Sequence, residues 1–253
     1  MIALKTPQEI EIMRTANVIV AEVLAELRRQ VRPGVTTAEL DRIAEEMTRA
    51  RGATAAFKGY TVAGPPFPSS VCISINDEVV HGIPSARRVL QPGDIVGLDF
   101  GVQYKSFFGD SAVTIAVGGT DAESERLMRA TREALWAGIE QVHVGRRLGE
   151  VSAAIQERAE RDGFSVVREF VGHGIGRRLH EEPQVPNFGK RDRGIRLQEG
   201  MVLAIEPMVN AGTPEVRVIE DGWTAVTSDG RRSAHFEHSV AVTATGPYVL
   251  SQL

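Results

Sequence analysis

Cysteine is almost absent from this chain of 253 residues, whose one thiol is Cys72. A single cysteine excludes an internal disulfide and a cysteine-based zinc site, and it fits a reducing compartment. No apolar run reaches the roughly 18 residues that a membrane span needs. The first six residues also lack the apolar core of a signal peptide. We therefore expect a cytoplasmic protein that does not cross a membrane.

An excess of positive charge is also lacking. Lysine and arginine number 29 against 33 acids, which gives a net charge of −4. Pairs of arginines are scattered along the chain, which is typical of solvated faces rather than of a phosphate-binding track. We expect no direct nucleic-acid site. The hydrophobic content of 42% and the charged content of 25% are ordinary for a globular protein with one large domain or two small ones.

The most informative pattern is a strand-like segment that ends in an acid and occurs twice. Residues 90–99 read LQPGDIVGLD and residues 197–206 read LQEGMVLAIE, so Asp99 and Glu206 are equivalent at an offset of 107 (206 − 99). Strands are depleted in Asp and Glu, and a carboxylate is costly to bury unless something pairs with it. The repeat therefore predicts one shared cation site between two related halves.

Each half also begins with a pair of predicted helices. Thr6 opens a capping box with a proline at the first helical position, and an apolar stripe follows until Pro33-Gly34. The other predicted helices run from the cap at 36 to about 52, over roughly 123–141, and from the turn at Gly145 to about 163. A His-Gly-Ile sequence follows each pair, at His81 and at His173. We interpret the chain as one α+β domain with internal pseudo-two-fold symmetry, whose halves span roughly 6–118 and 121–248.

A hairpin is predicted after each acid, and its return strand carries a second acid, Asp110 in the first half and Glu237 in the second. The second hairpin is longer, and we expect an inserted strand pair between 215 and 230. Four carboxylates cannot remain ionised together without a cation. With one imidazole, for which we favour His173, they would supply ligands to two divalent metals. The alternative is that these acids lie at hairpin ends and face solvent. The occurrence of four acids at equivalent positions in the two halves disfavours this alternative.

The predicted chemistry is hydrolysis of an amide or an ester. Two metals about 3.5–4 Å apart would activate a water and polarise a carbonyl, and Glu206 could relay a proton from that water. His81 and His180 lie beside turn residues and are candidates for contacts with the substrate, although capped loop residues are the alternative. We interpret His143, His235 and His238 as ordinary residues without a role.

Six further short motifs occur along the chain, and they are SVCISIN at 70–76, EVVHGIP at 78–84, GHGIG at 172–176, HEEP at 180–183, IEPM at 205–208 and FEH at 236–238. Together they resemble those of the bacterial type I methionine aminopeptidases, over essentially the whole chain. The resemblance implies the pita-bread fold and removal of the initiator methionine from new proteins and peptides with a small second residue. It also implies two divalent metals per chain, drawn from cobalt, manganese, iron and zinc.

The resemblance implies roles for individual residues as well. The metals would be bound by Asp99, Asp110, His173, Glu206 and Glu237, with Asp110 and Glu237 bridging. His81 would contact the scissile amide or the leaving amine, and His180 would hydrogen-bond the substrate carbonyl and the tetrahedral intermediate. The methionine pocket would involve Tyr60, Phe67, Cys72 and Trp223, and the segment 61–66 is longer than is usual in the family. The implied partner is a peptide or nascent-protein N-terminus, and we further expect a monomer that associates with the ribosome.

Two other functions are open at this stage. A prolidase or aminopeptidase P would share the fold and the pattern of metal ligands. In those enzymes, however, a sizeable N-terminal domain usually precedes the catalytic module. A non-catalytic binding protein of the same fold would have lost metal ligands, whereas all five are present here.

Overall fold

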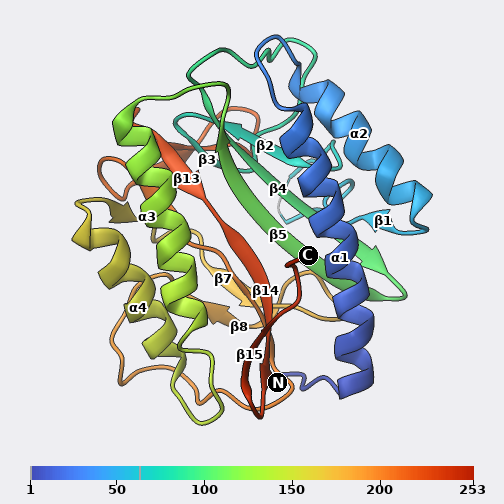
Figure 1. The fold of residues 1–253 in the computed structure, drawn as a ribbon, viewed down its shortest axis with the longest axis vertical. Helices are drawn as coiled ribbons and strands as arrows, with labels where there is room; N and C mark the ends of the chain where they lie inside the picture. The colour runs from blue at the N-terminus through green and yellow to red at the C-terminus, as the bar shows by residue number, and fades with distance from the viewer. Residues whose placement is uncertain (1, 63) are drawn as a thin grey trace.

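In the computed structural model, which describes residues 2–62 and 64–253, four helices lie against one face of a large sheet (Figure 1). The helices are α1 (Pro7–Gln30), α2 (Thr37–Ala50), α3 (Ala122–Ile139) and α4 (Leu148–Arg161). Their positions confirm the four predicted helices. Thr6 and Thr36 each close a capping box with the glutamate three residues later, which satisfies backbone N–H groups at the helix start. None of the helices in the described ranges is long and apolar enough to cross a membrane.

The main sheet has nine strands, with the order β1-β4-β5-β14-β9-β7-β8 along its path, while β2 pairs with β4 and β15 with β14. The strands of this sheet are β1 (Thr54–Ala55), β2 (Cys72–Ile75), β4 (Ile95–Tyr104), β5 (Phe107–Ala116), β7 (Gly172–Gly174), β8 (Glu181–Val185), β9 (Val202–Ile205), β14 (Glu237–Thr243) and β15 (Gly246–Val249). All their pairings are antiparallel. Strands from both predicted halves therefore share one sheet, and β5 meets β14 near its centre.

Two small sheets complete the fold. One has the order β13-β10-β6, with β6 (Ser165–Val166), β10 (Met208–Asn210) and β13 (Ser233–His235). The other has the order β11-β12-β3, with β3 (Glu78–Val80), β11 (Val216–Val218) and β12 (Ala225–Thr227). The antiparallel pair β11–β12 confirms the strand pair that was expected between 215 and 230.

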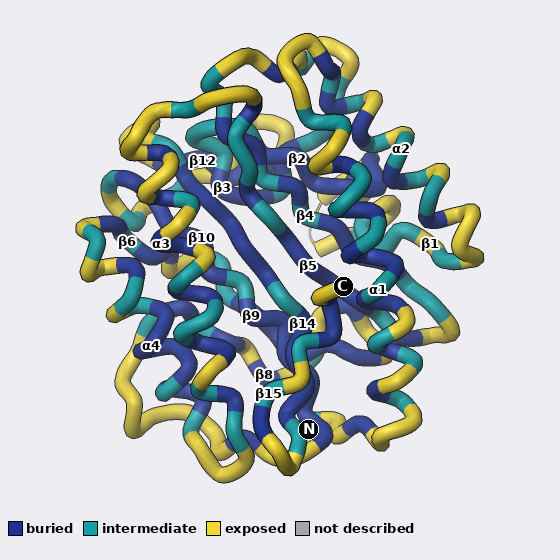
Figure 2. The backbone as a smooth tube through the Cα atoms, viewed as in Figure 1, coloured by how far each residue is buried: buried dark blue, intermediate teal, exposed yellow. Residues whose placement is uncertain are grey.

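The hydrophobic core lies between the helices and the main sheet, and it has two large parts. Leu24, Leu27 and Leu40 of the first helix pair pack with Val96 and Leu98 of β4. A second cluster packs α3 and α4 against β9 and β14. Figure 2 shows these strands as the most continuously buried part of the chain, with exposed residues concentrated in the loops. Apolar burial of this kind stabilises a fold by about 25 cal/mol for each Å² removed from water, so the central strands are held rigidly.

The segment 61–68 forms the predicted loop, although Ala63 lies outside the described residues. The amide of Phe67 donates to the carbonyl of Tyr60 at 2.8 Å, and the amide of Gly59 donates to the carbonyl of Phe67 at 2.8 Å. These two bonds close the loop at its base. Phe67 is buried, whereas Val62 is 78% exposed, so the longer segment extends outward while its ends stay fixed.

Candidate metal centre

Strand register places three of the four repeated acids on one face of the main sheet. Asp99 on β4 and Glu237 on β14 both lie opposite Ala112 on β5. Residues opposite one another in paired strands point to the same face, as do residues two apart in one strand. Asp110, two residues before Ala112, therefore points to the same face. The small side chain of Ala112 leaves space between the acids.

The same register brings in the remaining acid and the histidine. His173 on β7 lies opposite Ala204 on β9, and Ala204 lies opposite Ser239 on β14. Glu206 follows Ala204 by two residues and Glu237 precedes Ser239 by two. The His173 Nε2 and Glu206 Oε1 atoms are 3.4 Å apart, which shows that the two side chains meet.

The resulting cluster fits a divalent metal. Asp110, His173 and Glu237 offer ligand atoms that all lie within 4.8 Å of one another, and their exposed fractions are 4%, 7% and 2%. Asp110 Oδ1 and Glu237 Oε1 are buried and have no hydrogen-bond partner among the described residues. Buried carboxylate oxygens without partners are costly. A cation bound between them would remove that cost, and carboxylate oxygens with one imidazole suit manganese, iron, cobalt or zinc.

The electrostatics of the metal-free cluster agree with this interpretation. Burial raises the pKa of Asp99 to about 7. Burial, and then the charge of Asp99, raise the pKa of Asp110 well above its usual value. The pKa values of Glu206 and Glu237 are raised by burial and by the neighbouring acids. Mutual repulsion of this kind is relieved by a metal ion, whose positive charge favours the ionised carboxylates.

His173 is prepared to act as a ligand through one particular nitrogen. Its Nδ1 lies 2.9 Å from the carbonyl oxygen of Gly174, which can only accept, so Nδ1 carries the proton and Nε2 is left with a lone pair. Burial and the nearby His180 lower the pKa of His173 to about 3. The ring is therefore neutral near pH 7, as a metal ligand must be.

Comparison with known proteins gives the same picture. Residues 11–244 match the model of metallopeptidase family M24. The chain belongs to metallopeptidase family M24. A methionine aminopeptidase of Clostridium perfringens is 51% identical over 99% of this chain and 99% of its own length. The crystal structure of methionine aminopeptidase from Thermotoga maritima superimposes with a TM-score of 0.97 at 47% identity, over the whole of both chains.

The likeness to the prolidase from Pyrococcus horikoshii shows the fold of this chain. It has a TM-score of 0.77 at 21% identity, and the match covers 98% of this chain but 63% of the prolidase. The predicted pita-bread fold is thereby confirmed, and so is the α+β class. The family assignment makes the chain a metal-dependent peptidase.

The histidines predicted to contact the substrate lie next to the cluster. The ring centroids of His180 and His173 are 4.2 Å apart, and the Tyr60 hydroxyl lies 2.7 Å from His180 Nδ1. His81 follows β3 and has a positive φ of 61°, a backbone conformation that few non-glycine residues adopt outside functional sites. Burial and the nearby His180 lower the pKa of His81 to about 4, so both neutral rings can act as hydrogen-bonding groups.

The four residues predicted to form the methionine pocket are also brought to this region. The rings of Phe67 and Trp223 meet edge to face at 5.3 Å, and the Trp223 ring is 6.3 Å from His81. The Trp223 indole donates to the carbonyl of Pro65 at 3.0 Å, which ties the longer loop to the site. Cys72 lies opposite Asp99 in the β2–β4 pairing, so it shares the face of the acids.

Sequence reasoning missed two residues at this site. We interpreted His235 as an ordinary residue, but it ends β13, is 4% exposed, and has an Nε2 atom with no partner within the described ranges. That atom is 3.9 Å from Glu206 Oε2. Phe170 contacts the His81 ring edge to face at 5.5 Å. His235 could have been found from its position two residues before Glu237, but nothing in the sequence singles out Phe170.

A buried ion pair fixes the loop that carries His180. The Lys5 ammonium donates to Glu181 Oε2 at 2.7 Å, and both side chains are less than a tenth exposed. Glu181 Oε1 accepts from the amides of Arg177 and Arg178 at 2.8 and 3.1 Å. Burial alone would raise the pKa of Glu181, but the Lys5 contact and these amides lower it overall. The N-terminal segment thus holds the residue that follows His180.

We expect Lys5→Met to lower the free energy of unfolding by about 3 kcal/mol, because removing one partner of a buried pair leaves the other charge uncompensated. Chemical denaturation monitored by circular dichroism would measure this. The control is Arg42→Gln, which breaks an exposed pair with Glu46 and should change stability by less than about 1 kcal/mol. Equal effects of the two substitutions would contradict the role given to Lys5.

Proposed function

We propose that this chain is a methionine aminopeptidase that removes the N-terminal methionine from peptides and newly made proteins. The observation that carries the proposal is the buried cluster of Asp110, His173 and Glu237, which lies next to aromatic side chains. The cluster would hold the metals that hydrolyse the peptide bond, and the pocket would select the side chain of the first residue. The high identity to methionine aminopeptidases along the full chain supports the same substrate.

We propose that Asp99, Asp110, His173, Glu206 and Glu237 would hold two divalent metals when these are bound. When bound, the metals would lower the pKa of a water and polarise the scissile carbonyl. Glu206, whose carboxylate lies beside the proposed ligand His173, would accept the proton that the attacking water loses. The metal identity among cobalt, manganese, iron and zinc remains a prediction.

His180 and His81 would both act on the substrate beside the cluster. If the Tyr60 hydroxyl donates to His180 Nδ1, the proton of the neutral ring lies on Nε2. That N–H can donate to the substrate carbonyl oxygen and to the oxyanion that replaces it in the tetrahedral intermediate. His81 is neutral as well, so it can hydrogen-bond the scissile amide or the leaving amine without adding a charge.

The substrate side chain would enter between Tyr60, Phe67, Cys72 and Trp223. An unbranched thioether packs well against aromatic edges, and Phe67 and Cys72 are buried. The same walls leave little space beyond the first residue, so we expect preference for a small second residue. Tyr60 and Trp223 lie at the partly exposed rim of this pocket, and their roles in it remain predictions.

We also infer that residues 1–253 act as one catalytic domain built from two related halves, 6–118 and 121–248. Asp99 and Asp110 come from the first half, and His173, Glu206 and Glu237 from the second, so neither half would hold the metals alone. A substrate made at the ribosome would place the enzyme in the cytoplasm. Ribosome association and a monomeric state remain predictions.

The deciding experiment compares two peptides. The purified protein is stripped of metal, reloaded separately with Mn, Fe, Co or Zn, and assayed on Met-Gly-Met-Met and on an X-Pro peptide. We expect metal-dependent release of methionine and no cleavage before proline. Cleavage of the X-Pro peptide alone would assign a prolidase-like activity, and no cleavage with any metal would favour a binding protein.

A further inference from the structure

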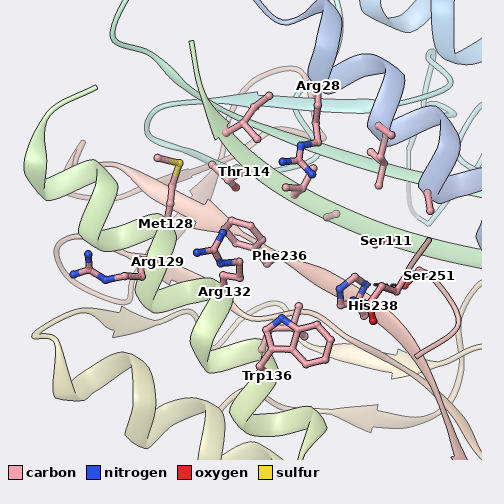
Figure 3. Close-up of a pocket in the computed structure, with 18 of the residues that line it drawn as sticks. Arg28, Ser111, Thr114, Met128, Arg129, Arg132, Trp136, Phe236, His238 and Ser251 are labelled. Carbon is pink, nitrogen blue, oxygen red and sulfur yellow. Dashed lines mark hydrogen bonds between the residues drawn. The ribbon is translucent and has the colours of Figure 1, made fainter. Parts of the chain in front are cut away.

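A cavity of about 530 Å³ lies between the two helix pairs. Ser111 on β5 and His238 on β14 line it, and each directly follows a proposed metal ligand, Asp110 or Glu237. Successive strand residues point to opposite faces, so the cavity lies across the sheet from the metal centre. Figure 3 shows α1 on one side of this space and α3 on the other, with β5 and β14 beneath.

The floor and walls of the cavity are mostly apolar. Val113 and Ile115 on β5 line it, as do Met128 and Trp136 on α3, and all four are only partly buried. The indole of Trp136 packs edge to face on the His238 ring at a centroid distance of 5.5 Å. A strip of apolar side chains is thus left uncovered by the described part of the chain, and such surfaces commonly bind an apolar group.

Three arginines stand at the mouth of the same cavity. Arg28 comes from α1, and Arg129 and Arg132 come from α3. Within the described ranges, none of the three forms an ion pair or a side-chain hydrogen bond, although Arg158 and Arg232 of the same chain do both. Figure 3 shows Arg28 and Arg132 extending over the strands from the two sides.

The charge balance at the cavity favours an anion. Glu125 is the one acidic side chain among the lining residues, against three guanidinium groups, in a protein whose net charge is −4. Guanidinium groups bind carboxylates and phosphates through paired, charge-assisted hydrogen bonds. Arg28 and Arg132 therefore provide a local positive site, whereas the charge of Arg129 also acts on Asp162, whose pKa it lowers.

We propose that this cavity binds an amphipathic anion, whose carboxylate or phosphate head contacts Arg28 and Arg132 while its apolar body covers Val113, Ile115 and Trp136. The volume lies within the range of about 300–1,000 Å³ typical of small-ligand pockets. Its size therefore suits a small amphiphile.

Decanoate is a suitable probe, because it combines one carboxylate with a short apolar chain. Metal-loaded full-length protein, freed of excess metal, is titrated with decanoate by calorimetry and by tryptophan fluorescence. We expect saturable binding at one site and a change in emission that Trp136→Phe removes. Decanol, which lacks the charge, should bind at least about tenfold more weakly, since a lost charge-assisted bond corresponds to about that factor.

The Arg28→Gln/Arg132→Gln double variant should weaken decanoate binding about tenfold or more. The matched control is Arg49→Gln/Arg161→Gln, which removes the same charge from the last turns of two other helices and should leave affinity unchanged. Met128→Glu, which adds an anion to the wall, should also abolish binding.

Several results would overturn the proposal. They are the absence of saturable binding, equal affinity for decanol, and affinity that survives the loss of Arg28 and Arg132. The last would be seen if decanoate bound at the metal centre instead. None of these readouts depends on peptide hydrolysis, so the outcome is independent of the proposed peptidase activity.

Discussion

Glu206→Gln should lower kcat/KM for a Met-Gly peptide by at least about 100-fold while the protein remains folded. Positioned proton transfer alone contributes about 100-fold to 10,000-fold, and Glu206 is also proposed to hold a metal. The substitution keeps the size of the side chain but removes its charge and its basicity. Steady-state kinetics on the Mn-loaded protein would measure the loss.

The stability of the same variant separates catalysis from folding. Burial and the charges of Asp99 and Asp110 raise the pKa of Glu206, so the metal-free cluster gains nothing from an ionised Glu206. We expect the metal-free variant to be at least as stable as the parent protein. The matched control is Glu199→Gln, an exposed acid in the second copy of the repeat, which should leave both activity and stability unchanged. Near-normal turnover by Glu206→Gln would remove Glu206 from the mechanism.

The sequence was sufficient to predict the helices and the acidic cluster, because both leave local patterns. The capping boxes at Thr6 and Thr36 depend on residues three positions apart. The acids were predictable for a different reason. A duplicated strand with an acid at its end indicates equivalent positions, and the antiparallel register of β4, β5 and β14 then places Asp99, Asp110 and Glu237 on one face.

Two contacts at the site, that of the missed His235 with Glu206 and that of Tyr60 with His180, join distant segments of the chain. His235 faces Glu206 because β13 pairs with β10, which directly follows Glu206 in the chain. Tyr60 reaches His180 because hydrogen bonds at the base of the loop hold its two ends together. Neither pairing produces a periodic pattern or a motif. The cavity between α1 and α3 was likewise unpredictable, because Arg28 and Arg132 meet there only through the placement of the two helix pairs.

Removal of the metals should make the stability of the protein fall as the pH rises from about 7.5 to about 8.5. In the metal-free protein the pKa of Asp99 is raised to about 7, and those of Asp110, Glu206 and Glu237 are raised as well, in each case mainly by burial. In the unfolded chain these acids have a pKa near 4. The native state therefore holds more protons than the unfolded state, and stability decreases as they are lost.

The histidines fix the lower limit of this pH window. Burial lowers the pKa values of His81 and His238 to about 4, those of His173 and His235 to about 3, and that of His180 as well. Between about pH 5 and about pH 7.5 these rings are protonated mainly in the unfolded state, so their contribution rises with pH and opposes that of the acids. Above about pH 7.5 they are almost fully neutral in both states, and the acids alone determine the slope.

Metal binding should reverse the trend. Ligands must lose their protons to bind a metal, so affinity increases with pH, and a metal at 100 times its Kd stabilises the native state by about 2.7 kcal/mol. Thermal unfolding with EDTA and with added Mn²⁺ would test this, and the rise in Tm on adding Mn²⁺ should be greater at pH 8.5 than at pH 6.5. The slope should be weaker in metal-free Glu206→Gln, because one of the four proton-binding acids is gone. A metal-free protein that becomes more stable across this window would show that these carboxylates are not held together in a buried site.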